Sequence, residues 1–234
     1  MAGGLKEVRE RIASVQNTMQ ITSAMKMVAA AKLRRAQDAI TRMRPYAEKL
    51  QVVLSNVSGS LDSGEGVFST KRKTKRILYL AITSNRGLCG GFNNNIMKAI
   101  RQEMAQTDAE CHVLPLGKKA NDAYKKLPEL NPVGFEDDAW QIFDDLNFDR
   151  AQIVAEHIME QFEGGQYDEV KMVYNRFVNA AVQVATVENY LPLEASEEVV
   201  DAAPGNDTDY IFEPSQDEIV ERIIPNSLKV QLYK

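Results

Sequence analysis

The chain has 234 residues, of which 44% are hydrophobic and 26% charged, and its formal net charge is −5. This is the profile of an ordinary globular protein, and no run of 18 apolar residues is present that would span a membrane. Residues 1–7 have neither the apolar core of a signal peptide nor the Arg- and Ser-rich character of a transit peptide. Two cysteines, Cys89 and Cys111, fit neither a disulfide framework nor a metal site, so we expect a reducing cytoplasm.

The charge is unevenly distributed along the chain. Residues 1–50 contain ten Lys or Arg and four Asp or Glu, a net charge of +6, so the remaining residues carry −11. A basic segment joined to an acidic body is typical of a protein that docks onto a surface of opposite charge.

Residues 1–57 predict one long coiled-coil helix. No glycine lies between Gly4 and Gly59, and the only proline there is Pro45, where we expect a bend. A heptad repeat starting at Leu5 places 14 apolar residues at 16 seam positions, with Thr22 and Lys26 as the exceptions. A spacing of 3.5 residues kept over this length favours a supercoiled helix of about 80 Å, which needs a partner to cover its seam.

Residues 25–31 of this helix, MKMVAAA, are small and apolar on nearly all sides. A helix that is apolar all round is enclosed on several sides, so we expect the rod to pass through another structure here. Basic side chains surround this stretch, at Lys26, Lys32, Arg34 and Arg35.

The remaining residues predict an α/β domain. We expect a Gly- and Ser-rich linker over 58–75 and a domain over 76–214, with strands at 77–82, 111–116, 169–174 and 181–187. Helices are predicted between them at 93–106, with Asn93 as its N-cap, and at 118–126 and 148–162. Because strands and helices alternate, the fold class is α/β, a Rossmann-like and mostly parallel sheet with right-handed crossovers.

The last segment, residues 215–234, predicts the start of a C-terminal coiled-coil helix. It follows a polar, acidic loop at 194–209 and opens with the capping-box residues Ser215 and Glu218. Since no breaker follows its apolar pattern, we expect the partner helix of residues 1–57 to be missing or truncated.

Two motifs are compatible with ligand binding, and each has a purely structural alternative. The glycine-rich residues 84–91 could cradle a phosphate at a helix N-terminus, although Gly87, Gly90 and Gly91 match no nucleotide-binding spacing; the alternative is a tight strand-to-helix turn. Asp145, Asn147 and Asp149, with Glu156 eleven residues beyond Asp145, approach a calcium loop that has Arg150 where glycine is required; the alternative is a cluster of acidic residues at a helix N-terminus, favoured by the helix dipole.

No catalytic arrangement can be assembled from the sequence. The two histidines, His112 and His157, are far apart and lack a second nearby ligand, so packing or surface roles are expected. The basic residues of the first helix are sparser than those of a DNA-binding basic region, and the acidic total charge disfavours nucleic acid. We expect no catalytic residues, no cofactor and no metal.

Four segments resemble the gamma subunit of F-type ATP synthases, in its bacterial form. They are IASVQNTMQITSAMKMVAAAK at 12–32, SNRGLCGG at 84–91, where that family often has Asp in place of Asn85, NRFVN at 175–179 and YIFEP at 210–214. The likeness covers the whole chain, but members of that family continue for roughly fifty residues more, in keeping with the need of the seam for a helix of like extent.

This resemblance implies a non-catalytic rotor subunit. The coiled coil would turn inside a ring of alpha and beta subunits, and the α/β domain would hold the epsilon subunit and sit on the c-ring, at the cytoplasmic face of the cell inner membrane. Rotation would drive the catalytic sites through states of different nucleotide affinity. The partner-binding residues expected on this basis are Met25, Lys26, Met27, Lys32, Arg34, Arg35, Arg86 and Cys89.

Two other functions remain open at this point. One is a small nucleotide-binding α/β enzyme with a coiled-coil dimerisation arm, which would bind ATP or NAD tightly. The other is a DNA-binding coiled coil, whose binding would depend on salt.

Overall fold

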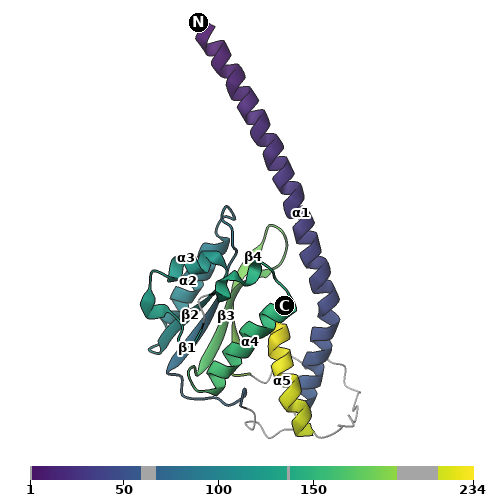
Figure 1. Ribbon diagram of the computed structural model, residues 1–234, viewed down its shortest axis with the longest axis vertical. Helices are drawn as coiled ribbons and strands as arrows, with labels where there is room; N and C mark the ends of the chain where they lie inside the picture. The colour runs from purple at the N-terminus through teal and green to yellow at the C-terminus, as the bar shows by residue number, and fades with distance from the viewer. Residues whose placement is uncertain (1, 59–66, 136–137, 194–215) are drawn as a thin grey trace. The chain divides into compact units, whose positions relative to one another are not determined.

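The computed structural model describes residues 2–58, 67–135, 138–193 and 216–234 (Figure 1). The chain divides into two compact units, one formed by residues 1–49 together with the last residue and one formed by residues 50–233. The first unit is helical, and the second contains the sheet. None of the helices in the described ranges combines the length and apolar character needed to cross a bilayer.

Helix α1 is a single uninterrupted element, Ala2–Ser58, that continues through Pro45. Every residue from 4 to 42 is exposed, including the apolar seam, where Leu5 is 67% exposed, Ile12 52% and Met19 65%. Removing apolar surface from water is favourable by roughly 25 cal/mol per Å². A partner that covers this exposed stripe would therefore stabilise α1.

The second unit is built on a four-stranded sheet with the order β2-β1-β3-β4. Strand β1 (Arg76–Ile82) pairs in parallel with β2 (Glu110–Leu116) and with β3 (Glu169–Phe177), whereas β4 (Gln183–Leu191) pairs antiparallel with β3. Leu78, Tyr79, Leu80 and Ala81 are all 0% exposed, as expected for a central strand covered on both faces. The predicted fold class, a mostly parallel α/β sheet with a long N-terminal helix, is confirmed.

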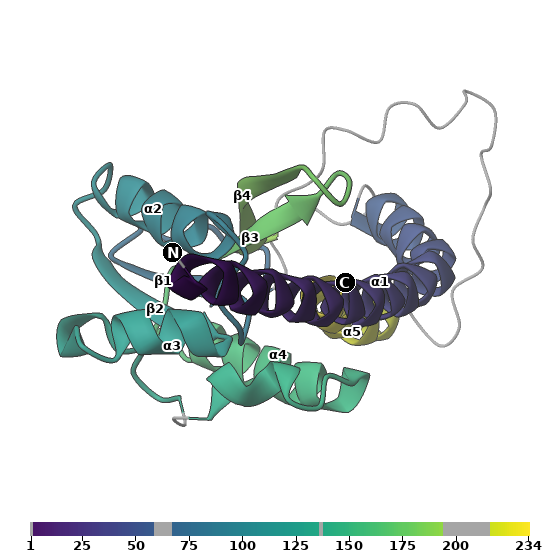
Figure 2. The same ribbon diagram turned by 90° about the horizontal axis from the view of Figure 1, so that it is seen from above.

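Helices cover both faces of this sheet (Figure 2). On one face, α2 (Phe92–Met104) contributes Ile96 and Ile100 to a core that also includes residues of α3 (Lys118–Tyr124). On the other face, α4 (Phe148–Glu163) and α5 (Gln216–Tyr233) pack over Leu78 and Leu80. Two short 3-10 helices, η1 (Pro128–Leu130) and η2 (Ala139–Phe143), lie between α3 and α4 in the chain.

Polar contacts hold α5 on the second unit. The buried hydroxyl of Tyr190 in β4 donates to the carbonyl of Leu228 at 2.9 Å. The Lys229 ammonium lies 2.6 Å from Glu156 Oε1 of α4, and Tyr233 meets Phe148 edge to face. The C-terminal helix is therefore tied to the sheet and to α4 through side chains as well as through apolar packing.

Two local predictions were wrong. Asn93 is not the N-cap of α2; Gly91 occupies that position, and the Asn93 side chain turns back to accept from the Ser84 amide at 2.9 Å. The last strand begins at Gln183 rather than at residue 181, because the amides of Ala181 and Val182 both donate to Asn179 Oδ1 in the hairpin turn. The predicted loop at 194–209 and the capping residue Ser215 lie outside the described residues.

Replacing Gly117 tests the junction between β2 and α3. Gly117 has φ +113°, and a Cβ there would lie 2.2 Å from the backbone oxygen of Thr83. Gly117→Ala should therefore lower the free energy of unfolding by about 3 kcal/mol, from strain and backbone clash together. Chemical denaturation measures this, with Gly87→Ala as the control, since its Cβ would meet only Lys119 Cε at 3.9 Å. Equal effects of the two substitutions would contradict the geometry.

The ion pair between α4 and α5 predicts a pH dependence. The hydrogen bond from Lys229 lowers the pKa of Glu156 below its ordinary value of 4.5. A lowered folded-state pKa stabilises the protein above that ordinary value, and the contribution disappears as the pH falls through the lowered pKa. Glu156→Gln should cost at most about 1 kcal/mol at pH 7, because solvent screens a half-exposed glutamate. In urea denaturation at several pH values, the difference from wild type should shrink below pH 4.5; a difference that stays constant over this range would contradict the ion pair.

Candidate functional site

The partner-binding residues expected on the first helix lie in the exposed part of α1. Met25 is 56% exposed and Met27 65%, and Lys26, Lys32, Arg34 and Arg35 are exposed as well. Their side chains are available to a partner along the full circumference of the helix.

These side chains do not gather on one face of α1. Residues seven apart share a face of a helix, so Lys32 lies one step along from Met25, and Arg34 lies one step along from Met27. Lys26 and Arg35 project from the flanks between them. A smooth apolar and alanine-rich stretch is therefore followed by positive charge on several sides, an arrangement suited to a surrounding partner rather than to a flat one.

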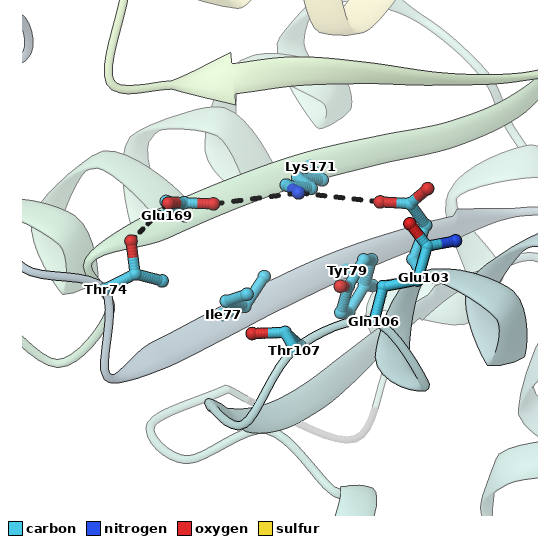
Figure 3. Close-up of a pocket in the computed structure, with 8 residues that line it drawn as sticks. All are labelled: Thr74, Ile77, Tyr79, Glu103, Gln106, Thr107, Glu169 and Lys171. Atoms are coloured by element: carbon cyan, nitrogen blue, oxygen red, sulfur yellow. Dashed lines mark hydrogen bonds and ion pairs between the residues drawn. The ribbon is translucent and has the colours of Figure 1, made fainter.

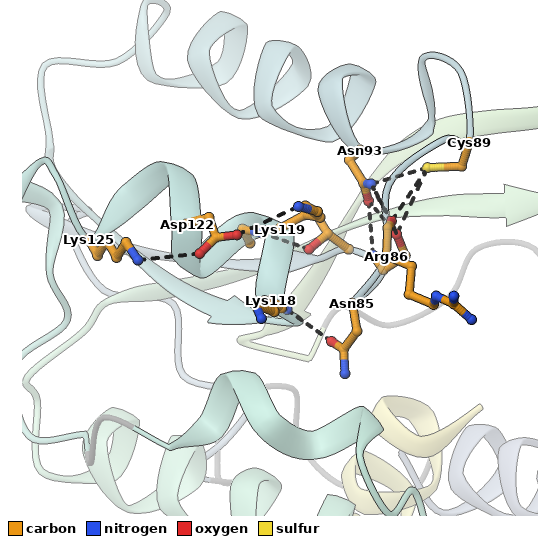
Figure 4. A network of polar contacts seen from close by, with 11 residues as sticks. Asn85, Arg86, Cys89, Asn93, Lys118, Lys119, Asp122 and Lys125 are labelled. Atoms are coloured by element: carbon orange, nitrogen blue, oxygen red, sulfur yellow. Dashed lines mark hydrogen bonds and ion pairs between the residues drawn. The ribbon is translucent and has the colours of Figure 1, made fainter.

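The second group of expected residues lies on the turn between β1 and α2, which is held from inside by Asn93 (Figure 4). Asn93 Nδ2 donates to Ser84 Oγ at 3.0 Å and to Cys89 Sγ at 3.2 Å, and Ser84 Oγ donates to the carbonyl of Arg86 at 2.6 Å. The Asn93 side chain fills the inside of the turn, and Gly90 takes φ +59° to close it. These hydrogen bonds and this backbone conformation explain why asparagine and glycine occur in the turn. No bound phosphate is needed to explain either residue.

A second set of hydrogen bonds joins the turn to neighbouring elements. Asn85 Oδ1 accepts from the Lys118 amide at 2.9 Å, and Asn85 Nδ2 donates to Asp144 at 2.8 Å. The Thr83 hydroxyl oxygen accepts from the Ala120 amide at 2.9 Å. The turn is thus fixed to the start of α3 and to the residue after η2, so the side chains on its outer surface are presented by a rigid support.

Three residues of the turn are exposed, although the Cys89 sulfur turns back toward Asn93. Arg86 and Cys89 are exposed, and the Arg86 guanidinium extends away from its own turn without a partner among the described residues. Leu88 is fully exposed and has φ +62°, a conformation that costs a leucine about 1–2 kcal/mol. Sequence reasoning missed Leu88; the only signal was an apolar residue within a run of glycines.

The other candidate motifs have structural roles. Asn147 Oδ1 accepts from the Arg150 amide at 2.9 Å and so caps α4, and Asp149 lies in the first turn, where the helix dipole favours an acid. Within the described ranges no group of three or more His, Cys, Asp or Glu is placed to hold a metal ion. His112 meets the ring of Tyr167 edge to face, and His157 stacks on Phe135, so each histidine packs against an aromatic ring.

Comparison with known proteins places the chain in one family. A family model described as ATP synthase matches residues 4–234. A protein of Flavobacterium johnsoniae named ATP synthase gamma chain is 50% identical over 98% of this chain and 78% of its own length. A protein of the same name from Trichlorobacter lovleyi is 38% identical, again over 98% of this chain and 78% of its own length.

Chains in two solved structures have a fold similar to that of this chain. A chain in a cryo-EM structure of the central stalk and c-ring of Tetrahymena thermophila mitochondrial ATP synthase matches with a TM-score of 0.60 and 23% identity, covering 91% of this chain and 89% of that one. A chain of the Euglena gracilis mitochondrial ATP synthase rotor matches with a TM-score of 0.55 and 22% identity, over 100% of this chain and 82% of that one. With relatives of up to 50% identity and a family model over residues 4–234, the chain belongs to the ATP synthase gamma chain family.

Proposed function

We propose that this chain is the central-stalk rotor subunit of a proton-translocating F-type ATP synthase. It couples rotation of the membrane c-ring to ATP synthesis or hydrolysis in a head of alpha and beta subunits. Membership of the gamma chain family supports this assignment, as does the resemblance of its fold to rotor chains.

The observation that carries the proposal is the 57-residue helix α1, in which residues 4–42 are all exposed. Transmission of torque requires an element that is long and does not fold back on itself, and α1 meets this requirement. Its apolar seam requires a cover, which an enclosing ring of subunits and a second helix would supply. An enzyme with a dimerisation arm would also use such a seam, but the turn after β1 is filled by Asn93 instead of being open to a nucleotide.

Rotation needs contacts that are easily exchanged. Residues 27–31 of α1 offer a mostly small and apolar surface. The basic residues next to them would meet acidic patches of the beta subunits one after another. Exposed ion pairs contribute only about 0–1 kcal/mol each, so no single contact would trap the rotor in one position. Coupling then arises because each rotor position stabilises a different conformation of the surrounding sites.

The second unit would provide the attachment to the rest of the rotor and a further contact with the head. Arg86 and Cys89 are exposed residues of a rigid turn and are proposed to bind a neighbouring subunit, with Leu88 between them in the chain. The epsilon subunit and the c-ring are the other proposed partners of this unit. The chain itself performs no catalysis in this proposal and is held peripherally at the cytoplasmic face of the cell inner membrane through the complex.

Charge reversal on α1 tests the proposal. Arg34→Glu combined with Arg35→Glu, in the assembled enzyme, replaces two attractive contacts with acidic patches by repulsive ones. We expect the rates of proton-driven ATP synthesis and of ATP-driven proton pumping to fall roughly fivefold, the equivalent of about 1 kcal/mol. Both rates are measured in reconstituted vesicles.

The matched control reverses two adjacent basic residues of the second unit, Lys125→Glu with Lys126→Glu, both of which are exposed. This variant should assemble and couple like wild type. Unchanged synthesis and pumping in the Arg34 and Arg35 variant would remove the proposed role of these arginines.

A further inference from the structure

A polar cavity of about 280 Å³ lies on the α2 side of the sheet, at the C-terminal end of α2, whereas the turn described above precedes its N-terminal end (Figure 3). It is bordered by the starts of β1 and β3 and by the end of α2 with the two residues that follow its cap. Its volume is just below the range of about 300–1,000 Å³ typical of small-molecule sites. The cavity therefore has room for a small ligand or for one end of a larger ligand.

The charged side chains in this cavity do not balance. Lys171 of β3 lies 3.5 Å from Glu103 Oε2 and 3.7 Å from Glu169 Oε2, so one ammonium is shared by two carboxylates. Glu169 Oε1 also accepts from the Thr74 hydroxyl. Among the described residues, however, no group bonds to Glu103 Oε1, and one negative charge remains without a counter-ion.

The end of helix α2 adds to this negative potential. Glu103 belongs to the last turn of the 13-residue helix, and Gln106 and Thr107 follow directly after it. The C-terminal end of a helix carries the equivalent of about half a negative charge and stabilises cations placed there. The helix end and the carboxylates therefore both make the electrostatic potential in the cavity negative, which favours a bound cation.

Tyr79 gives an independent indication that the cavity is a binding site. Its side chain is 0% exposed and lines the cavity, yet no group in the part of the chain that the structure describes meets its hydroxyl in hydrogen-bonding geometry. The neighbouring Cys111 sulfur, a weak acceptor, interacts with this hydroxyl without replacing a full hydrogen bond, and its own thiol donates to the carbonyl of Ala109 at 3.3 Å. Burial raises the pKa of Tyr79, with Cys111, Glu103 and Glu169 adding to the effect, so the phenol stays protonated. An unpaired buried hydroxyl costs about 1–3 kcal/mol, and a ligand that bonds to it would recover this.

We propose that this cavity binds the ammonium or guanidinium head of a small organic cation, between Glu103, Glu169 and the Tyr79 hydroxyl. N–H donors of the ligand would bond to Glu103 Oε1 and to the phenol oxygen, which accepts as well as donates. The ligand supplies the positive charge that Lys171 alone does not.

Other ligand classes fit the cavity less well. A divalent metal ion would need several oxygen ligands, but the two carboxylates are already bridged by Lys171. An anion would be repelled by both carboxylates and by the helix end. A neutral ligand would leave the charge imbalance in place.

Ligand-observed ¹⁹F NMR on the full chain tests the proposal. The probes are 4,4,4-trifluorobutylguanidinium and 4,4,4-trifluorobutylammonium, with trifluorobutanol and trifluorobutyrate as neutral and anionic counterparts. The two cations should show saturable line broadening, and their counterparts should not. Glu103→Gln should weaken cation binding about tenfold or more, since it removes a hydrogen bond to a charged group.

Two further variants separate the site from general effects. Glu160→Gln removes an exposed carboxylate of α4, on the opposite face of the sheet, and should bind like wild type. Tyr79→Phe keeps the ring and should weaken binding severalfold. If Glu103→Gln melts at a lower temperature than wild type, so that its weaker binding could come from lost stability, the result for Tyr79→Phe is the one that tests the site. Equal broadening of all four probes, no broadening by the cations, or full binding in the folded Glu103 and Tyr79 variants would each overturn the proposal.

The same measurement on the assembled complex identifies the source of the cation. Cation binding that persists in the complex indicates a free small molecule as the natural ligand. Binding by the isolated chain that is lost on assembly indicates that a Lys or Arg side chain of a partner occupies the cavity. Both results support the site.

Discussion

The described structure depends on one constraint, which is that α1 cannot bury its own apolar seam. Its 57 residues form one helix, and the seam residues from Leu5 to Met19 are more than half exposed. The hydrophobic effect therefore favours any arrangement that encloses the helix, and a sequence with this surface is stabilised by association. The basic residues after the alanine-rich stretch limit which surroundings are favourable, because they disfavour burial without acidic partners.

The second unit satisfies its own constraints internally. Strand β1 is covered on both faces, and α5 is tied to β4 and α4 through Tyr190 and Lys229. The turn after β1 is fixed by Asn85 and Asn93, so Arg86 and Leu88 are presented by a stiff support. An exposed leucine held at a positive φ has no role in the core of this unit, which makes it a feature of the outer surface.

The sequence predicted the parts of the fold that depend on periodicity and composition. The seam of α1 and the apolar block of β1 were readable because their side-chain patterns repeat over many residues or are uniformly apolar. Asn93 was misplaced because asparagine serves equally as a helix cap and as a side chain that closes a turn, and only the path of the backbone distinguishes these roles. The start of β4 was misplaced because Ala181 and Val182 continue the strand pattern, while Asn179 draws their amides into the turn. The cavity beside Tyr79 could not be predicted, since Glu103 and Lys171 meet only through the tertiary structure.

The central claim is that this chain transmits rotation within an assembled ATP synthase. The most direct measurement fixes the catalytic head to a surface and attaches a gold bead to the second unit, through an azide-bearing side chain introduced at the exposed position of Lys98. Under ATP, the account predicts that the bead turns in one direction through repeated steps. A bead that stays in place while the same molecules hydrolyse ATP at the normal rate would contradict it.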